Sequence, residues 1–355
     1  SVAPILVVTG RRGVGRTTFL NIVAKRIFDD CTVVRVNLPD RLSDPGALFD
    51  AAVSAAYRDA GTEPPSASGA ETASDTDVAL FSARESFQAL AAVGRGRPVV
   101  VMVEPLEHLF TRRVGGAQLV ESVLTQLRHS PSSVWWILTA STHAWALLEK
   151  LEPNAPTLAS RLDLAPFDRD ELEEVVLKRH RKSGLPLRFE APPGASRRIQ
   201  SEARRAPGEA DRQAVYRREF FDWLARLSSG DLTLAQFYWL RALELDRQDR
   251  VLKVRAQTPL NFAFLADLDL DRAFALKAFL SHGSLTPVEY AQITGETLLR
   301  CLVLFESLYG LRLIRPAGSG EPSEPVAVSA AERYRLHPLT AGPVVDYLVA
   351  QRIIH

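Results

Sequence analysis

The stretch that most constrains the fold is GRRGVGRTT, residues 10–18, because it follows the apolar run ILVVT and opens the helical pattern TTFLNIVAKRIF. A glycine-rich turn from a strand into a helix, spaced G-x-x-x-x-G-[basic]-T, is typical of a phosphate-binding loop. Its backbone N–H groups and the helix N-terminus would face a single anion. We therefore expect an ATP or ADP site, with Mg²⁺ on the Thr17 hydroxyl, formed by Gly10, Arg11, Arg12, Gly13, Val14, Gly15, Arg16, Thr17 and Thr18. The alternative is a glycine-rich turn that binds nothing.

Arg16 occupies the position at which this loop ordinarily carries lysine. Lysine has a compact ammonium on a flexible stem, whereas arginine has a longer, planar fork, so the charge is kept and the geometry is changed. Phosphoryl transfer depends almost entirely on positioning and electrostatics. Nucleotide binding is therefore expected to persist better than hydrolysis. Arg11 and Arg12 add positive charge to the loop, where they either close it or face solvent.

The first half of the chain alternates apolar runs with helical patterns, which predicts an α/β fold with a mostly parallel sheet buried on both faces. The expected strands are 5–8, 33–37, 99–103, 135–139 and 161–164, and the expected helices are 17–28, 45–57, 78–92, 118–129 and 143–151. The polar segment 61–77 is expected to be a surface loop. A length of 355 residues indicates more than one domain.

Beyond residue 166 we expect strands to stop and helices to dominate. The sequence predicts a P-loop core over 1–166, a helical lid over 167–257 with a basic insertion at 191–213, and a third domain over 258–355. In that last part a helix–turn–helix pattern is followed by two strands, LRLIRP and ERYRLHP, around the polar tip AGSGEPSEP. This order is typical of a winged helix.

Two further strands end in polar residues that fit a nucleotide site. The run RPVVVMVEPLEHLF resembles a Walker B strand, but Val103 precedes a lone carboxylate, Glu104, which could bind the metal or polarise water but not do both. Glu107 is expected on a following helix, facing solvent. The strand WWILTAST ends with Thr139 and Ser141, whose hydroxyls would lie near a γ-phosphate. A buried strand with a single acidic end explains the first stretch almost equally well.

The order of these parts resembles the AAA+ ATPases of the initiator, or origin-recognition, clade and their STAND-type relatives. The resemblance implies that Arg161, in SRLDL, reaches the nucleotide of a neighbouring subunit. It also places Thr233, in GDLTLA, where the lid usually presents a sensor arginine. With Arg16 and Val103 this makes three departures, which together imply a pseudo-ATPase, a nucleotide-binding regulatory or scaffold protein with weak or absent hydrolysis. The alternatives are an active, oligomer-dependent AAA+ ATPase, with or without an association with DNA through residues 178–218, and a nucleotide-free interaction platform.

Charge and composition limit the partners of the chain. The net charge is +1, so any binding to nucleic acid or membrane must be local. Residues 178–218 hold twelve Lys/Arg against four Asp/Glu, a patch that would either bind an anionic partner or remain solvated. The expected reading helix, TGETLLRCLVLFESLYGL, has one basic residue, Arg300, and therefore favours protein contacts over DNA reading. Expected partners are other protein subunits, including copies of this chain.

Cellular context is indicated by what the sequence lacks. Cys31 and Cys301 are far apart, which argues against a disulfide framework or a zinc site. No apolar run reaches the roughly 18 residues of a membrane helix. A cytoplasmic protein is expected, and because the sequence opens directly on a core strand, it is expected to be a fragment of a longer one.

Overall fold

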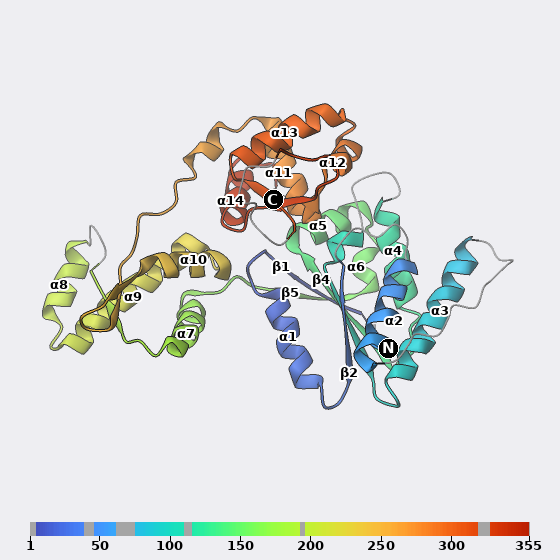
Figure 1. Ribbon diagram of the computed structural model, residues 1–355, viewed down its shortest axis with the longest axis horizontal. Helices are drawn as coiled ribbons and strands as arrows, with labels where there is room; N and C mark the ends of the chain where they lie inside the picture. Colours follow the sequence, from blue (N-terminus) through green and yellow to red (C-terminus); the bar gives the residue numbers. More distant parts are fainter. Residues whose placement is uncertain are drawn as a thin grey trace. The chain divides into compact units, whose positions relative to one another are not determined.

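The computed structural model describes residues 5–38, 46–61, 75–109, 116–191, 196–318 and 327–354 (Figure 1). The predicted loop 61–77 and wing tip 317–325 lie largely outside these residues. The chain forms two compact units. The first unit comprises residues 1–10, 15–164 and 270–336, and the second comprises 11–14, 165–269 and 337–355. The three-domain division at residues 166 and 257 stays a prediction.

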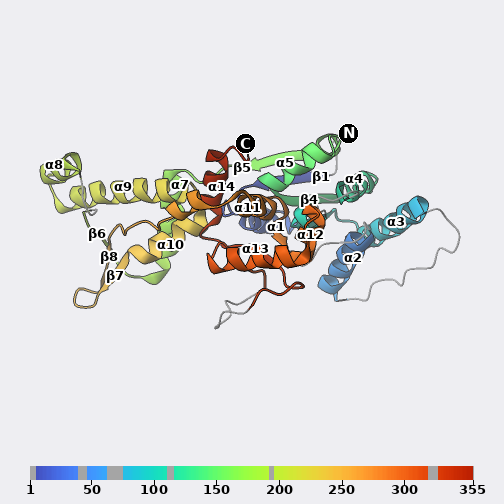
Figure 2. The same ribbon diagram turned by 90° about the horizontal axis from the view of Figure 1, so that it is seen from above.

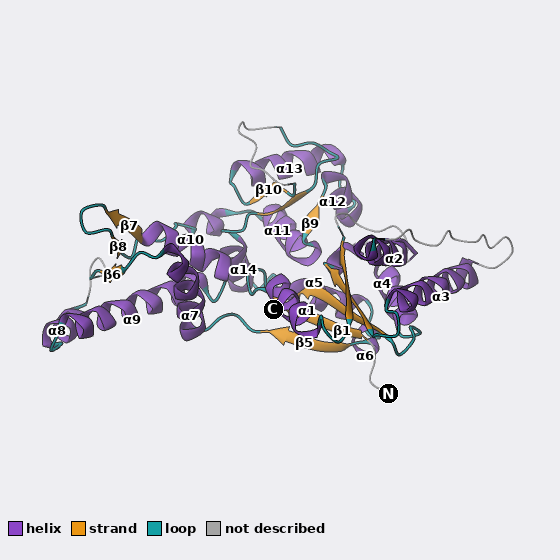
Figure 3. Ribbon diagram, turned by 60° about the horizontal axis from the view of Figure 1, so that its bottom comes forward, coloured by secondary structure: helices purple, strands orange, loops and turns teal. Residues whose placement is uncertain are grey.

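A five-stranded parallel sheet forms the centre of the first unit, and Figure 3, which draws all strands in orange, labels two of its strands, β1 and β5. The strand order is β2-β3-β4-β1-β5, so β1 lies inside the sheet. The strands are β1 (Ile5–Gly10), β2 (Thr32–Asn37), β3 (Val99–Glu104), β4 (Val134–Ser141) and β5 (Ser160–Leu164). The connecting helices are α1 (Arg16–Ile27), α2 (Gly46–Ala60), α3 (Asp75–Val93), α4 (Gly116–Leu127), α5 (Thr142–Leu151) and α6 (Ala155–Leu158). The expected α/β fold is confirmed.

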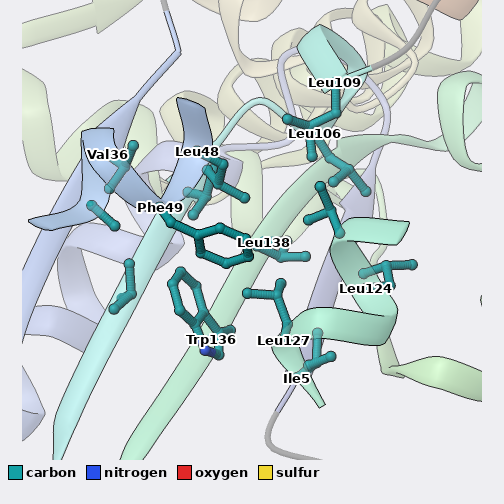
Figure 4. Close-up of a cluster of buried hydrophobic side chains, with 14 of the residues drawn as sticks. Ile5, Val36, Leu48, Phe49, Leu106, Leu109, Leu124, Leu127, Trp136 and Leu138 are labelled. Atoms are coloured by element: carbon teal, nitrogen blue, oxygen red, sulfur yellow. The ribbon is translucent and has the colours of Figure 1, made fainter. Parts of the chain in front are cut away.

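The core explains why these apolar runs become strands. Side chains at alternate positions of the central strands enter one large cluster, part of which Figure 4 shows around Phe49 and Trp136. Phe87 meets both of these rings edge to face. Leu20, Val100 and Met102 form a smaller cluster, because successive strand residues point to opposite faces. The sheet is therefore apolar on both faces. Polar functional groups are left to the strand ends.

A small three-stranded sheet with three helices completes the first unit. Its elements are α11 (Leu270–His282), β9 (Ser284–Leu285), α12 (Pro287–Thr294), α13 (Leu298–Gly310), β10 (Ile314–Pro316) and β11 (Tyr334–Leu336), and its strand order is β10-β11-β9. Phe305 of α13 is buried against Phe279, Tyr290 and Tyr334. The helices and strands follow the order that the winged-helix prediction requires.

The second unit is mostly helical, as expected, but the expectation that strands stop after residue 166 is wrong. Its helices are α7 (Arg169–His180), α8 (Arg197–Arg205), α9 (Glu209–Ser228), α10 (Leu232–Ala242) and α14 (Ala341–Ala350), with short 3₁₀ turns η2 (Arg181–Ser183) and η3 (Ala263–Asp267). A second small sheet has the order β6-β8-β7, formed by β6 (Leu187–Phe189), β7 (Leu243–Asp246) and β8 (Val251–Val254). These strands are short and half-polar, so their apolar pattern was too weak to read.

The basic insertion expected at 191–213 is largely helical in its described part. Figure 2 shows α8 and α9 as consecutive helices. Ile199, Ala203 and Val215 are buried together, since residues at helical spacing share one face. The many arginines between these residues made the apolar pattern hard to recognise in the sequence. The break between α9 and α10 falls at Ser229 and Gly230, as expected.

Candidate functional site: the phosphate loop

The phosphate loop leaves the carboxyl end of β1, which lies inside the sheet between β4 and β5. Gly13 has a φ of 82° and Gly15 a φ of 86°, a left-handed conformation that favours glycine. Gly15 is the N-cap of α1, and its missing side chain leaves the helix without a side-chain cap. The first turn of α1 also lacks acidic residues. The free N–H groups and the helix dipole therefore suit an anion.

Thr17 lies in the first turn of α1 and faces the end of the Walker B-like strand. Its hydroxyl donates a hydrogen bond of 2.9 Å to Oε1 of Glu104, the last residue of β3. Thr17 and Thr18 are both exposed. The structure thus brings together Thr17 and Glu104, the two residues that were expected to hold a metal.

Glu107 does not face solvent, so that expectation is wrong. It lies in the 3₁₀ turn η1 (Leu106–Leu109), and only 3% of its surface is exposed. Its Oε1 is 3.6 Å from Nη1 of Arg16, and its Oε2 accepts a hydrogen bond of 3.2 Å from the backbone N–H of Ser141. Leu106 and Leu109 anchor the turn in the core, which draws Glu107 inward. No sequence pattern around Glu107 distinguishes it from an exposed glutamate.

Two polar residues at the end of β4, Thr139 and Ser141, are packed or hydrogen-bonded within the fold. Thr139 is buried and pairs in register with Val8 of β1. The Ser141 hydroxyl accepts a hydrogen bond of 3.1 Å from the N–H of Ala144 and so caps α5. A sensing role for Thr139 stays a prediction.

Arg161 takes part in a polar network within its own chain. Its guanidinium lies 2.8 Å from Asp163 and 3.0 Å from Glu149. A hydrogen bond from the Thr9 hydroxyl, together with Arg161, lowers the pKa of Asp163 although partial burial opposes the shift. The role of Arg161 toward a neighbouring subunit stays a prediction, and there it would compete with these carboxylates.

Asp231 contacts the loop within the second unit, which includes residues 11–14. Its Oδ1 caps α10 by accepting from the N–H groups of Thr233 at 2.7 Å and Leu234 at 3.1 Å. The carboxylate lies against Gly13, where an added Cβ would collide with it, and the Gly13 carbonyl accepts from Leu232 N–H at 3.1 Å. Burial raises the pKa of Asp231, opposed by the capping N–H groups and by the charge of Arg12.

The contact between Asp231 and Gly13 was not foreseen. The dipeptide Gly-Asp before an apolar helix signals an N-cap, and that signal is correct. It carries no information about the glycine loop more than two hundred residues earlier. Thr233, at the place of the expected sensor arginine, is exposed in the first turn of α10.

The basic segment 178–218 is less positive than its composition indicates. Five of its arginines form ion pairs: Arg188 with Asp249, Arg198 with Glu219, Arg212 with Glu209, Arg217 with Glu173 and Arg218 with Glu202. Three of the partners, Glu173, Glu219 and Asp249, lie outside the segment. The solvated alternative is therefore favoured for these arginines.

The outer face of α13 carries two strongly exposed apolar side chains. Leu299 and Val303, one turn apart, are 72% and 63% exposed. Arg300, the basic residue of this helix, pairs with Glu296 and Asp271. Within the described ranges, no helix combines the length and apolar character needed to cross a membrane, and no cluster of three His, Cys, Asp or Glu residues suits a metal ion.

Comparison with solved structures finds several chains of similar extent. The ORC2 protein of Aeropyrum pernix, in ADPNP–ADP complexes, is 14% identical over 99% of this chain and 89% of that chain, with a TM-score of 0.46. The ORC1 protein of Aeropyrum pernix in complex with DNA is 14% identical, covers 98% and 88%, and has a TM-score of 0.39. CDC6P of Pyrobaculum aerophilum is 13% identical, covers 99% and 89%, and has a TM-score of 0.37.

No protein-family model matches the sequence, and no curated protein matches it either. At identities and TM-scores this low, the similarity assigns no ligand or activity to this chain.

Proposed function

We propose that this chain binds ATP or ADP through residues 10–18 and acts as a nucleotide-dependent regulatory or scaffold protein with weak or absent hydrolysis. The observation that carries the proposal is the 2.9 Å hydrogen bond between the Thr17 hydroxyl and the Glu104 carboxylate. It joins the start of α1 to the end of β3, beside a helix N-terminus that no side chain caps. An anion at the loop and a cation at this pair would neutralise each other.

The donor set of this pair fits Mg²⁺. Magnesium in proteins is usually held by oxygen ligands from one or two carboxylates together with substrate phosphates and water. The Thr17 hydroxyl and the Glu104 carboxylate would supply the oxygen ligands of the protein. Bound Mg²⁺ would offset the charge of the phosphates.

Weak hydrolysis is proposed because the groups that would stabilise the reacting phosphate are missing or engaged. Pro105 follows Glu104 directly, so this turn lacks a second, adjacent carboxylate to polarise water. Glu107, the next carboxylate, contacts Arg16 and Ser141 instead. Thr233 replaces the lid arginine that the AAA+ resemblance implies. For comparison, an arginine finger that stabilises the reacting phosphate contributes about 10³ to 10⁵ in rate in phosphoryl-transfer enzymes.

Protein contacts are proposed as the output of the nucleotide state. The exposed pair Leu299 and Val303 on α13 supports this, since exposed apolar side chains that cluster on one face mark interaction sites. Sequence-specific DNA reading by α13 is not favoured, because base edges are read by polar and basic side chains. The partner is proposed to be another protein subunit, which includes a second copy of this chain.

Titration with fluorescent analogues of ATP and ADP, with and without Mg²⁺, tests the proposal. We expect saturable binding that tightens when Mg²⁺ is added, and a loss of that Mg²⁺ effect in the Thr17→Val variant. Thr157→Val removes an exposed hydroxyl in α6 and is the matched control, which should bind as the wild type does. A folded wild-type chain with no nucleotide affinity at millimolar concentration would overturn the proposal.

A further inference from the structure

Glu107 is held from several sides within the first unit. It belongs to the turn that follows β3, and its Oε2 accepts a hydrogen bond from the N–H of Ser141 at the end of β4. Gly283, in the turn between α11 and β9, has a φ of 71° and packs so closely that an added Cβ would lie 3.2 Å from Glu107 Cγ. The position of this carboxylate is therefore fixed by the sheet and by the small three-stranded module.

Arg16 meets this fixed carboxylate with one end of its guanidinium. Nη1 lies 3.6 Å from Glu107 Oε1, and the side chains of Arg16 and Glu107 are 18% and 4% exposed. Nη1 is buried, and within the described residues it makes no hydrogen bond. Its electrostatic partner is Glu107. Arg16 itself opens α1, at the lysine position of the phosphate loop.

A guanidinium can serve two anions at once in a way that an ammonium cannot. It carries five N–H donors in a rigid, planar fork, so that one edge can face a carboxylate while the other faces a phosphate. A lysine at this position would present a single point charge, which Glu107 and a phosphate would have to share. The arginine in the loop and the buried glutamate therefore suit each other.

We infer that Glu107 is a positioning residue for the bound nucleotide: it holds one edge of the Arg16 guanidinium so that the other edge meets the β- and γ-phosphates. The inference rests on the proposed nucleotide binding and adds the device that makes arginine effective in this loop. A purely structural ion pair between the same residues would stabilise the fold without favouring any nucleotide.

A four-protein cycle tests this role, using the wild type, Glu107→Gln, Arg16→Lys and the double variant. In each, the dissociation constants for MgATP, MgADP and AMP are measured at equilibrium. Glu107→Gln is expected to weaken ATP binding at least tenfold, ADP binding less, and AMP binding less than twofold. In the Arg16→Lys background the same change should alter ATP affinity less than twofold, because the lysine does not depend on Glu107.

Thermal unfolding of each variant shows whether it is folded, and Glu289→Gln is the matched control. Glu289 pairs with Arg333 at 2.8 Å in the small module, where the Glu289 side chain is 17% exposed, and its loss should leave ATP and ADP affinities unchanged. If Glu107→Gln weakens all three nucleotides equally, or none, or acts equally in both backgrounds, the inference is wrong. If the wild type binds no ATP, the proposed nucleotide binding itself fails.

Discussion

Replacing Asp231 with asparagine should tighten nucleotide binding. Asp231 places a buried carboxylate, 8% exposed, directly against Gly13 of the phosphate loop. Asparagine has nearly the same shape and is an equally good N-cap, so the hydrogen bonds to Thr233 and Leu234 can be kept. The variant therefore removes a negative charge from the loop and changes little else.

The size of the effect follows from the proximity of the carboxylate to the loop. A phosphate bound at Gly13 would lie about 5 Å from it, and two unit charges at that distance repel each other by about 3 kcal/mol at an effective dielectric constant of 20. Mg²⁺ and Arg12 offset part of this repulsion. We expect a net gain of about 1 kcal/mol, which corresponds to roughly fivefold tighter ATP binding.

The Asp231→Asn variant should also differ from the wild type in how its stability depends on pH. Burial raises the pKa of Asp231 in the folded chain above that of the unfolded chain. The contribution of Asp231 to the free energy of unfolding is therefore fully present below the ordinary carboxyl pKa, and it is lost as the pH rises through the raised pKa of the folded chain. The free energy of unfolding of Asp231→Asn should match the wild type at acidic pH and exceed it at neutral pH.

Isothermal titration of MgATP at pH 7.5 and denaturant unfolding across pH measure both effects. Asp246→Asn is the control, because it removes a carboxylate of the second unit that pairs with Lys253 rather than touching the loop. Unchanged or weaker ATP binding in a folded Asp231→Asn variant would refute the electrostatic reasoning. So would an advantage in stability that does not vary with pH.

Three further substitutions test the packing. Gly13→Ala should lower the free energy of unfolding by about 2 kcal/mol, because its φ of 82° strains any side chain and the new Cβ meets Asp231; a neutral result in denaturant titration would contradict the contact. Gly283→Ala should lower the melting temperature more than Gly295→Ala does. Both glycines have positive φ, but Gly283 faces Glu107 whereas Gly295 faces open space. Equal melting temperatures of the two variants would contradict the contact between Gly283 and Glu107. Trp136→Ala should cost about 3–5 kcal/mol in chemical denaturation, because the ring is buried against Phe49 and Phe87; a loss below about 1 kcal/mol would contradict its place in the core.

The parts of the fold that rest on strong local patterns were predictable. Apolar runs such as 99–103, and a glycine loop between a strand and a helix, are local signals that a sequence displays directly. The strands β6, β7 and β8 were missed because each has only three or four residues, and β6 pairs with β8, which lies far along the sequence. Short, half-polar strands are stabilised by these distant partners rather than by their own pattern.

The residues of the candidate site also fall into those that the sequence predicts and those that it does not. The loop residues and Glu104 follow from spacing, and the structure brings Thr17 and Glu104 into contact. Glu107 and Asp231 could not be recognised, because burial of a carboxylate depends on which elements pack over it. Glu107 is enclosed by β4 and by the turn at Gly283, and Asp231 by the loop at Gly13. These tertiary contacts have no counterpart in the neighbouring residues.

The most direct test of the central claim is to incubate the chain with radiolabelled MgATP, retain the complex on a filter, and determine how much of the bound nucleotide is ATP and how much is ADP over time. We predict stoichiometric retention with most of the label recovered as ATP for many minutes. Steady turnover near the ~1 s⁻¹ of ordinary enzymes would contradict the proposed weak hydrolysis. Absence of retained nucleotide would contradict the claim that the loop binds it.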